Sequence, residues 1–162
     1  MGSKECLRRQ LVLARDYTEK MLADFKTPEQ WTYQVHKNAN HALWFAGHMA
    51  VIDNFVLSLV APEQAQKLPE LEEKFGMGSQ PVSDPAAYPA PAEVLATMRE
   101  RREKVLAAFD HLTEEQFADP TGMKAPFATK GSLFEMAVWH EGLHSGQVSV
   151  ARRNIGAAPI LG

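Results

Sequence analysis

His140 and His144 stand four residues apart in the segment WHEGLHSGQ near the C-terminus, and both side chains can bind a transition metal. On an α-helix, residues with this spacing share one face with their Cβ atoms roughly 5–6 Å apart, so both imidazoles can reach one cation. The stretch HEGLH also fits the H-E-x-x-H pattern of zinc peptidases, in which the Glu is a general base. The pair therefore indicates a metal site, and its nature depends on a third ligand.

His48 is the best candidate for that third ligand. It lies on the apolar face of an expected helix over about residues 40–60. An imidazole on a face that must pack in the core needs a partner, because burying an unpaired polar ring is costly. His41 is the rival, one heptad earlier, but its place near the helix start favours an N-terminal or entrance-lining role. We therefore predict His48, His140 and His144 as the metal ligands.

Two polar residues beside the pair are candidates for catalysis. Glu141 has three readings: a general base, an acceptor for the N–H of a metal ligand, or a salt bridge at the helix flank. Gln147, one turn beyond His144, is placed either to contact the substrate or a water at the metal, or to make a helix-packing hydrogen bond. His36 fits a surface position. His111 fits the C-terminus of a helix, where an imidazolium suits the helix dipole.

The peptidase interpretation has two weaknesses. The third ligand of such enzymes usually follows the motif, yet no His, Asp, Glu or Cys follows His144. Peptidases of this type also bind substrate as an added strand, and the sequence has no evident strands. A zinc peptidase of the H-E-x-x-H type is therefore only a minor alternative.

Helices must position these side chains. Four segments have the helical spacing of apolar residues: about 4–25, 40–60, 92–112 and 132–154. Residues 61–91 are rich in proline and predict a long connection, with a helical turn at about 69–75. The stretches TPEQW and TEEQF each carry a capping box, Thr27 with Gln30 and Thr113 with Gln116. The sequence thus predicts one all-α domain over residues 1–162, an antiparallel four-helix bundle with a long crossover connection between its second and third helices.

Composition narrows the function classes. The net charge of -3 and the pI near 6.1 give no electrostatic footprint for nucleic acid. The most basic stretch, residues 99–104, alternates with glutamate, so Arg101 and Arg102 are expected on a solvated helix face. No apolar run is expected to reach the roughly 18 residues of a membrane span. The single cysteine, Cys6, and the lack of a signal-peptide pattern predict a cytoplasmic protein.

The blocks HALWFAGHMA and WHEGLHSGQ resemble the DinB/YfiT-like superfamily of metalloenzymes. The resemblance covers nearly the whole chain in helix order and spacing, and the matching residues lie in those two blocks. It implies a four-helix bundle with a long crossover, and His48, His140 and His144 as the three ligands. It does not imply DNA binding, despite the origin of the family name.

Three neutral imidazoles with a vacant coordination position are typical of a catalytic rather than a structural metal site. The ligand set suits zinc or nickel first, and iron or manganese also. The resemblance implies a metal-dependent hydrolase or a thiol-dependent transferase, hence a small-molecule substrate and a low-molecular-weight thiol as partners. A non-catalytic metal-binding stress-response module is the alternative. Gly142 and Gly146 favour close approach of another helix, and a homodimer is expected by family analogy.

Overall fold

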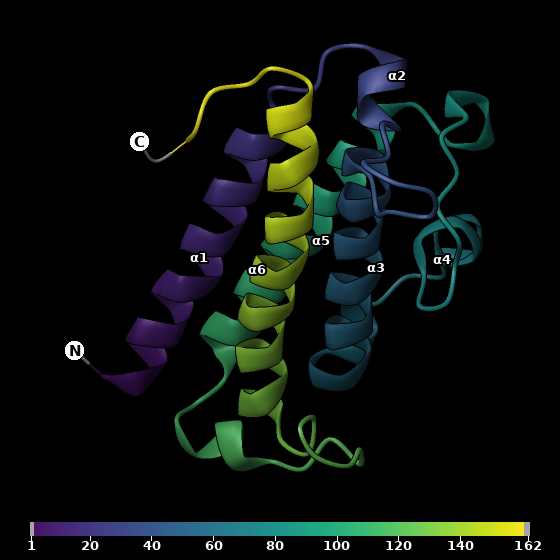
Figure 1. Ribbon diagram of the computed structural model, residues 1–162. Coiled ribbons are helices and arrows are strands. Elements are labelled where there is room, and N and C mark those ends of the chain that lie inside the picture. Colours follow the sequence, from purple (N-terminus) through teal and green to yellow (C-terminus); the bar gives the residue numbers. More distant parts are fainter. Residues whose placement is uncertain (1, 161–162) are drawn as a thin grey trace.

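All regular secondary structure within residues 2–160, the range that the computed structural model describes, is helical. Figure 1 shows four long helices side by side: α1 (Ser3–Leu22), α3 (Ala42–Val60), α5 (Pro91–His111) and α6 (Lys130–Asn154). The connections hold two short helices, α2 (Pro28–Trp31) and α4 (Pro69–Phe75), and three 3-10 turns: Pro62–Gln64, Pro85–Ala87 and Glu115–Ala118. No strand forms in this range, so the predicted all-α class is confirmed, and the helical turn expected at about 69–75 is α4.

Capping residues set where the helices begin. Thr27 and Gln30 form the predicted capping box at the start of α2, and the stretch TEEQF makes the same pair of hydrogen bonds. α6 begins at Lys130, two residues before the predicted start, because Thr129 and Ser132 form a capping box that the prediction missed. The reciprocal bonds satisfy backbone N–H groups that would otherwise lack partners at the helix end.

The long helices do not simply alternate in direction. Arg15 of α1 pairs with Glu141 of α6, and Asp24, just beyond the end of α1, pairs with Arg152, so α1 and α6 run parallel. The early parts of α3 and α5 share one hydrophobic cluster and their late parts share another, so these two helices are also parallel. The antiparallel contacts are α3 with α6 and α1 with α5. The departure from a uniformly antiparallel order follows from the long connection, which returns the chain to the end where α3 began (Figure 1).

α3 runs through the core. Within residues 2–160 it is the one helix long and apolar enough to cross a membrane by length and composition, contrary to the expectation that no such run exists. However, 72% of its most apolar window is buried inside the protein, which is what a core helix requires. It also carries the buried polar side chains of His48 and Asp53, which belong to the two polar groupings described next.

Candidate metal centre

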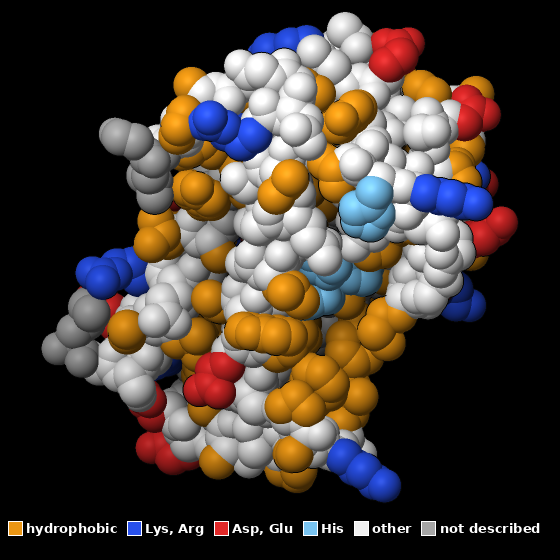
Figure 2. Space-filling view, in the orientation of Figure 1, with side chains coloured by type: hydrophobic (Ala, Val, Ile, Leu, Met, Phe, Trp, Pro, Cys, Tyr) orange, Lys and Arg blue, Asp and Glu red, His pale blue; other side chains and the backbone are white. Residues whose placement is uncertain are grey.

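The three predicted ligands converge between α3 and α6. These helices run in opposite directions and bring His48 beside His140 and His144, so that one ring nitrogen from each lies within 4.8 Å of the other two. The ring centroids are 4.6 Å apart for the pair on α6, and 5.1 and 4.9 Å from His48. Figure 2 shows pale-blue histidine side chains at the surface between the two helices.

Hydrogen bonds fix which nitrogen of two rings is free. The Nδ1 of His48 lies 2.6 Å from the backbone carbonyl oxygen of Phe75, and the Nδ1 of His144 lies 2.9 Å from the side-chain oxygen of Gln147. An amide oxygen only accepts, so each Nδ1 carries the proton and donates it. The Nε2 lone pairs of both rings are thereby left for another partner, as in histidine metal ligands held by an oxygen behind them.

His140 provides the test of whether a metal ion fits here. Its Nε2 lies 2.9 Å from the Nε2 of His144, and two lone pairs at that distance repel unless a proton or a cation lies between them. Its Nδ1 is buried and has no hydrogen-bond partner among the described residues. The donor set, three imidazoles with at least two Nε2 lone pairs directed inward, is one that zinc and nickel accept. The residues present therefore fit a divalent transition metal.

Burial keeps these rings neutral. The pKa of His48 is lowered to about 4, mainly by desolvation, with a smaller lowering by the neighbouring His144 and His140, while the hydrogen bond to the Phe75 carbonyl opposes the shift. Desolvation, together with His144, also lowers the pKa of His140 to about 4. Burial lowers the pKa of His144 as well. Neutral imidazole is the form that binds metal, so near neutral pH no proton has to be displaced from these rings.

Aromatic residues hold His48 in place. The ring of Trp44, one turn earlier on α3, stacks on the His48 ring with centroids 4.4 Å apart. On the other side, Phe75 packs directly on the backbone of Gly47, where an added Cβ would lie 2.3 Å from the Phe75 ring. Only glycine leaves room for this contact, which brings the Phe75 carbonyl to His48.

His41 lies outside the cluster and has the N-terminal role expected of it. Its Nδ1 accepts the backbone N–H of Trp44 at 3.0 Å and so caps α3. The ring is fully buried, and its edge packs against Tyr88. His36 and His111 are exposed, each with its Nδ1 beside a backbone carbonyl oxygen, and neither is part of the cluster.

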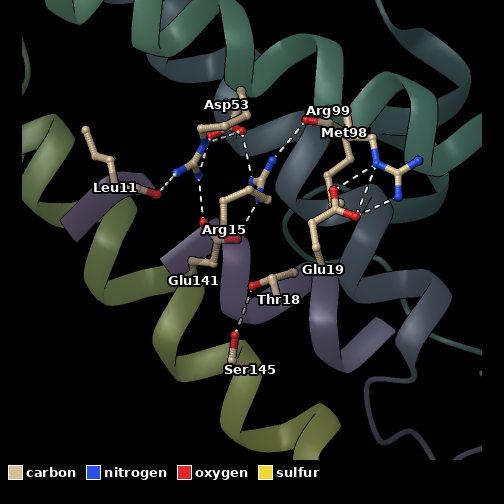
Figure 3. A network of polar contacts seen from close by, with 10 residues as sticks. Leu11, Arg15, Thr18, Glu19, Asp53, Met98, Arg99, Glu141 and Ser145 are labelled. Atoms are coloured by element: carbon tan, nitrogen blue, oxygen red, sulfur yellow. Dashed lines mark hydrogen bonds and ion pairs between the residues drawn. The ribbon is translucent and has the colours of Figure 1, made fainter. Parts of the chain in front are cut away.

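Glu141 lies in the core and not at the helix flank. Its two carboxylate oxygens accept hydrogen bonds from Arg15 and Arg102, at 2.7 Å each, and both arginines also bond Asp53 (Figure 3). Burial alone would raise the pKa of Glu141, but the two guanidinium groups outweigh it and hold the pKa below its usual value. Of the three readings of Glu141, the contacts match the salt bridge. A catalytic role for Glu141 stays a prediction without a contact to support it.

The sequence did not predict this buried network of ion pairs. Arg102 is 3% exposed and Arg101 is fully buried, so the solvated helix face predicted for them is wrong. Charges alternate along α5, but the partners of Arg102 come from α3 and α6, which local charge patterning cannot reveal. The one signal was Asp53, the only charged residue in α3, since a charge in a core helix must be paired.

Gln147 is placed behind the cluster. Its side-chain oxygen also accepts a hydrogen bond from Asn40 at 2.9 Å, so it ties His144 to the segment before α3. These contacts with His144 and Asn40 match the helix-packing hydrogen bond, one of the two predicted roles of Gln147. A contact of Gln147 with a substrate or a metal-bound water stays a prediction.

Comparison with known proteins agrees with the fold. The family model described as the DinB superfamily matches residues 10–148. No curated protein matches the chain. A crystal structure of a conserved protein from Enterococcus faecalis is similar, with 20% sequence identity, a TM-score of 0.61, and coverage of 94% of this chain and 96% of that one. At this identity the likeness concerns the fold alone.

Proposed function

The chain belongs to the DinB superfamily, and from that premise we propose that it is a small metal-dependent enzyme, a hydrolase or a thiol-dependent transferase. Family membership and the three-histidine cluster fit a metal-binding DinB-like protein. The observation that carries the proposal is the convergence of His48, His140 and His144 with the Nδ1 groups of two rings held from behind. The proposal takes the four long helices as one bundle and one domain.

The chain's own residues would prepare the site. Zinc or nickel, or else iron or manganese, would be held by the three imidazoles and would supply Lewis acidity toward a water, a thiol or a substrate oxygen. The Phe75 carbonyl and Gln147 fix the rotation of two rings, which lowers the entropy lost on binding metal. Trp44 and Phe75 keep bulk water from one side of His48. The exposed edge of the cluster between α3 and α6 leaves an approach for substrate.

The contacts of Glu141 favour these activities over a peptidase. A peptidase of the H-E-x-x-H type needs its Glu beside the reacting water, whereas both oxygens of Glu141 are bonded to guanidinium groups. Peptide substrates are also bound as strands against a sheet, and residues 2–160 contain none. A cytoplasmic location, inferred from the single cysteine, and a homodimer, inferred by family analogy and from the glycines of α6, also belong to the proposal.

A turnover screen tests the proposal. Protein loaded with zinc or nickel is assayed on ester, amide and thiol-conjugation substrates, beside His144→Ala treated in the same way. We expect turnover by the loaded wild-type protein that His144→Ala lacks. Stoichiometric metal without turnover in any of these screens would contradict the enzyme and favour the non-catalytic binding module.

A further inference from the structure

A cavity of about 690 Å³ opens next to the histidine cluster. It lies between α3 and α6, and the chain beyond α4 and the loop before α6 close its other sides. His140 belongs both to the cluster and to the wall of this cavity. A molecule in the cavity therefore contacts the candidate metal centre, and the volume is within the range of small-molecule sites.

The walls of the cavity are apolar and aromatic. Phe55 comes from α3, Met136 and Trp139 from α6, and Phe127 from the loop before α6. Trp139 is 65% exposed, which is unusual for so large an apolar side chain. In Figure 2, hydrophobic side chains gather below the histidines on this face. Burial against such walls favours binding only where the surface of the ligand is apolar too.

Most polar groups of the wall already have hydrogen-bond partners within the protein. Asn54 donates to the carbonyl of Gln66 at 2.8 Å and accepts from its N–H at 2.9 Å, and the Ser58 hydroxyl donates to the carbonyl of Phe55. The wall contains no lysine or arginine, and Glu72 is its one acidic residue. An anionic ligand would thus meet a carboxylate and no counter-charge along the walls.

We infer that the cavity binds the substrate, and that this substrate is a neutral, largely apolar small molecule whose metal-binding group lies at the His140 end. The inference rests on the proposed function and names the substrate class of the same site. An anionic thiol such as glutathione does not match these walls, so in a transferase reaction the cavity holds the apolar reactant.

The first experiment measures ligand binding to the cavity in the metal-free protein. The neutral fluorophore N-phenylnaphthylamine is titrated into the metal-free protein, and we expect saturable fluorescence enhancement with one site. Phe55→Glu should weaken binding about tenfold, because it places a charge in the wall. Leu13→Glu is the matched control: Leu13 is 64% exposed on α1, outside the cavity, and the affinity should not change. Trp139→Ala, which alters a side chain already largely exposed, should weaken binding with the fold intact.

The second experiment adds the metal. Acetohydroxamic and octanohydroxamic acid carry the same metal-binding group, and binding of each to the zinc-loaded protein is measured by calorimetry. We expect the longer chain to bind about tenfold or more tightly, because its methylenes are buried in the cavity. This gain should disappear in Phe55→Glu and persist in Leu13→Glu.

The outcomes separate the two proposals. If both hydroxamates bind equally well, or if N-phenylnaphthylamine binding is unaffected by Phe55→Glu and Trp139→Ala, the cavity is not the substrate site, and the metal centre stands. If neither hydroxamate binds although the fluorophore does, the open metal site itself is wrong, and the inference falls with it.

Discussion

The Nδ1 of His48 donates to the backbone carbonyl oxygen of Phe75, 27 residues further along the chain, over 2.6 Å. α4, through its C-terminal residue, therefore orients one ring of the three-histidine cluster without contributing a histidine to it. The contact exists because Gly47, the residue before His48, offers no Cβ where the Phe75 ring lies. The His48 side chain of α3 and a carbonyl of the long connection are thus held together through one glycine.

Gly47→Ala tests this relationship. The new Cβ would lie 2.3 Å from the Phe75 ring, so that ring and its carbonyl must move away from His48. We expect the zinc affinity, measured by competition with a chromophoric chelator, to fall about tenfold or more. Gly142→Ala is the matched control, since nothing lies within 4 Å of its added Cβ, and its affinity should equal that of the wild type. Equal affinity for Gly47→Ala would show that Phe75 does not orient the ligand.

Gln147→Leu tests the other oriented ligand. The change keeps the approximate size of the side chain and removes the oxygen that accepts the Nδ1 proton of His144. We predict zinc affinity about 10- to 100-fold weaker, as for loss of other groups that hold a metal-binding histidine. Gln10→Leu, at an exposed position of α1, controls for the loss of a surface amide. Unchanged affinity would return Gln147 to a packing role only.

The sequence predicted the parts of this protein that depend on local pattern. Apolar periodicity and the Thr27 capping box predicted where the helices lie along the chain. The four-residue spacing of two histidines on an amphipathic helix predicted that both side chains point to the same side. The third member, His48, followed from its place on an apolar face.

What the sequence did not reveal depends on contacts between distant segments. Nothing near Arg102 identifies Asp53 and Glu141 as its partners, because they lie 49 and 39 residues away on other helices. In the same way, the acceptor for His48 is a backbone carbonyl, and every residue has one. The cavity is likewise formed by five separate segments, and no single one of them carries its pattern.

Glu141→Gln tests the buried network. The substitution leaves Arg15 and Arg102 with Asp53 as their one remaining carboxylate, so two buried cations share one anion. Breaking such a pair costs about 3–5 kcal/mol, and we expect the free energy of unfolding, measured with urea, to fall by that order. Glu19→Gln, in the partly exposed pair with Arg99, should cost about 1 kcal/mol or less. A Glu141→Gln protein as stable as Glu19→Gln would contradict a structural role for the network.

His41, the buried N-cap of α3, is expected to make the stability of the protein depend on pH. Burial lowers the pKa of His41 to about 4, whereas an unfolded histidine titrates near 6.5. Between these values the unfolded chain binds more protons, so His41 makes stability fall as the pH drops from 6.5 towards 4 and leaves it unchanged above 6.5. The slope from one histidine is at most about 1.4 kcal/mol per pH unit.

His41→Asn isolates that contribution in the metal-free protein. Asparagine keeps a capping oxygen but does not titrate, so its stability should decline less steeply between pH 6.5 and 4. His48 and His140, which titrate in the same window, remain in both proteins and cancel in the comparison. Parallel stability curves for the two proteins across this window would contradict the assignment to His41.

The metal content of the purified, zinc-loaded protein tests the central claim most directly. After dialysis, elemental analysis should find one zinc ion per chain in the wild type and in His36→Ala, whose side chain is exposed and outside the cluster. His48→Ala, His140→Ala and His144→Ala should each retain far less, with circular dichroism showing an unchanged helical content. A full equivalent of zinc in His48→Ala and His144→Ala alike would contradict a shared three-histidine metal site.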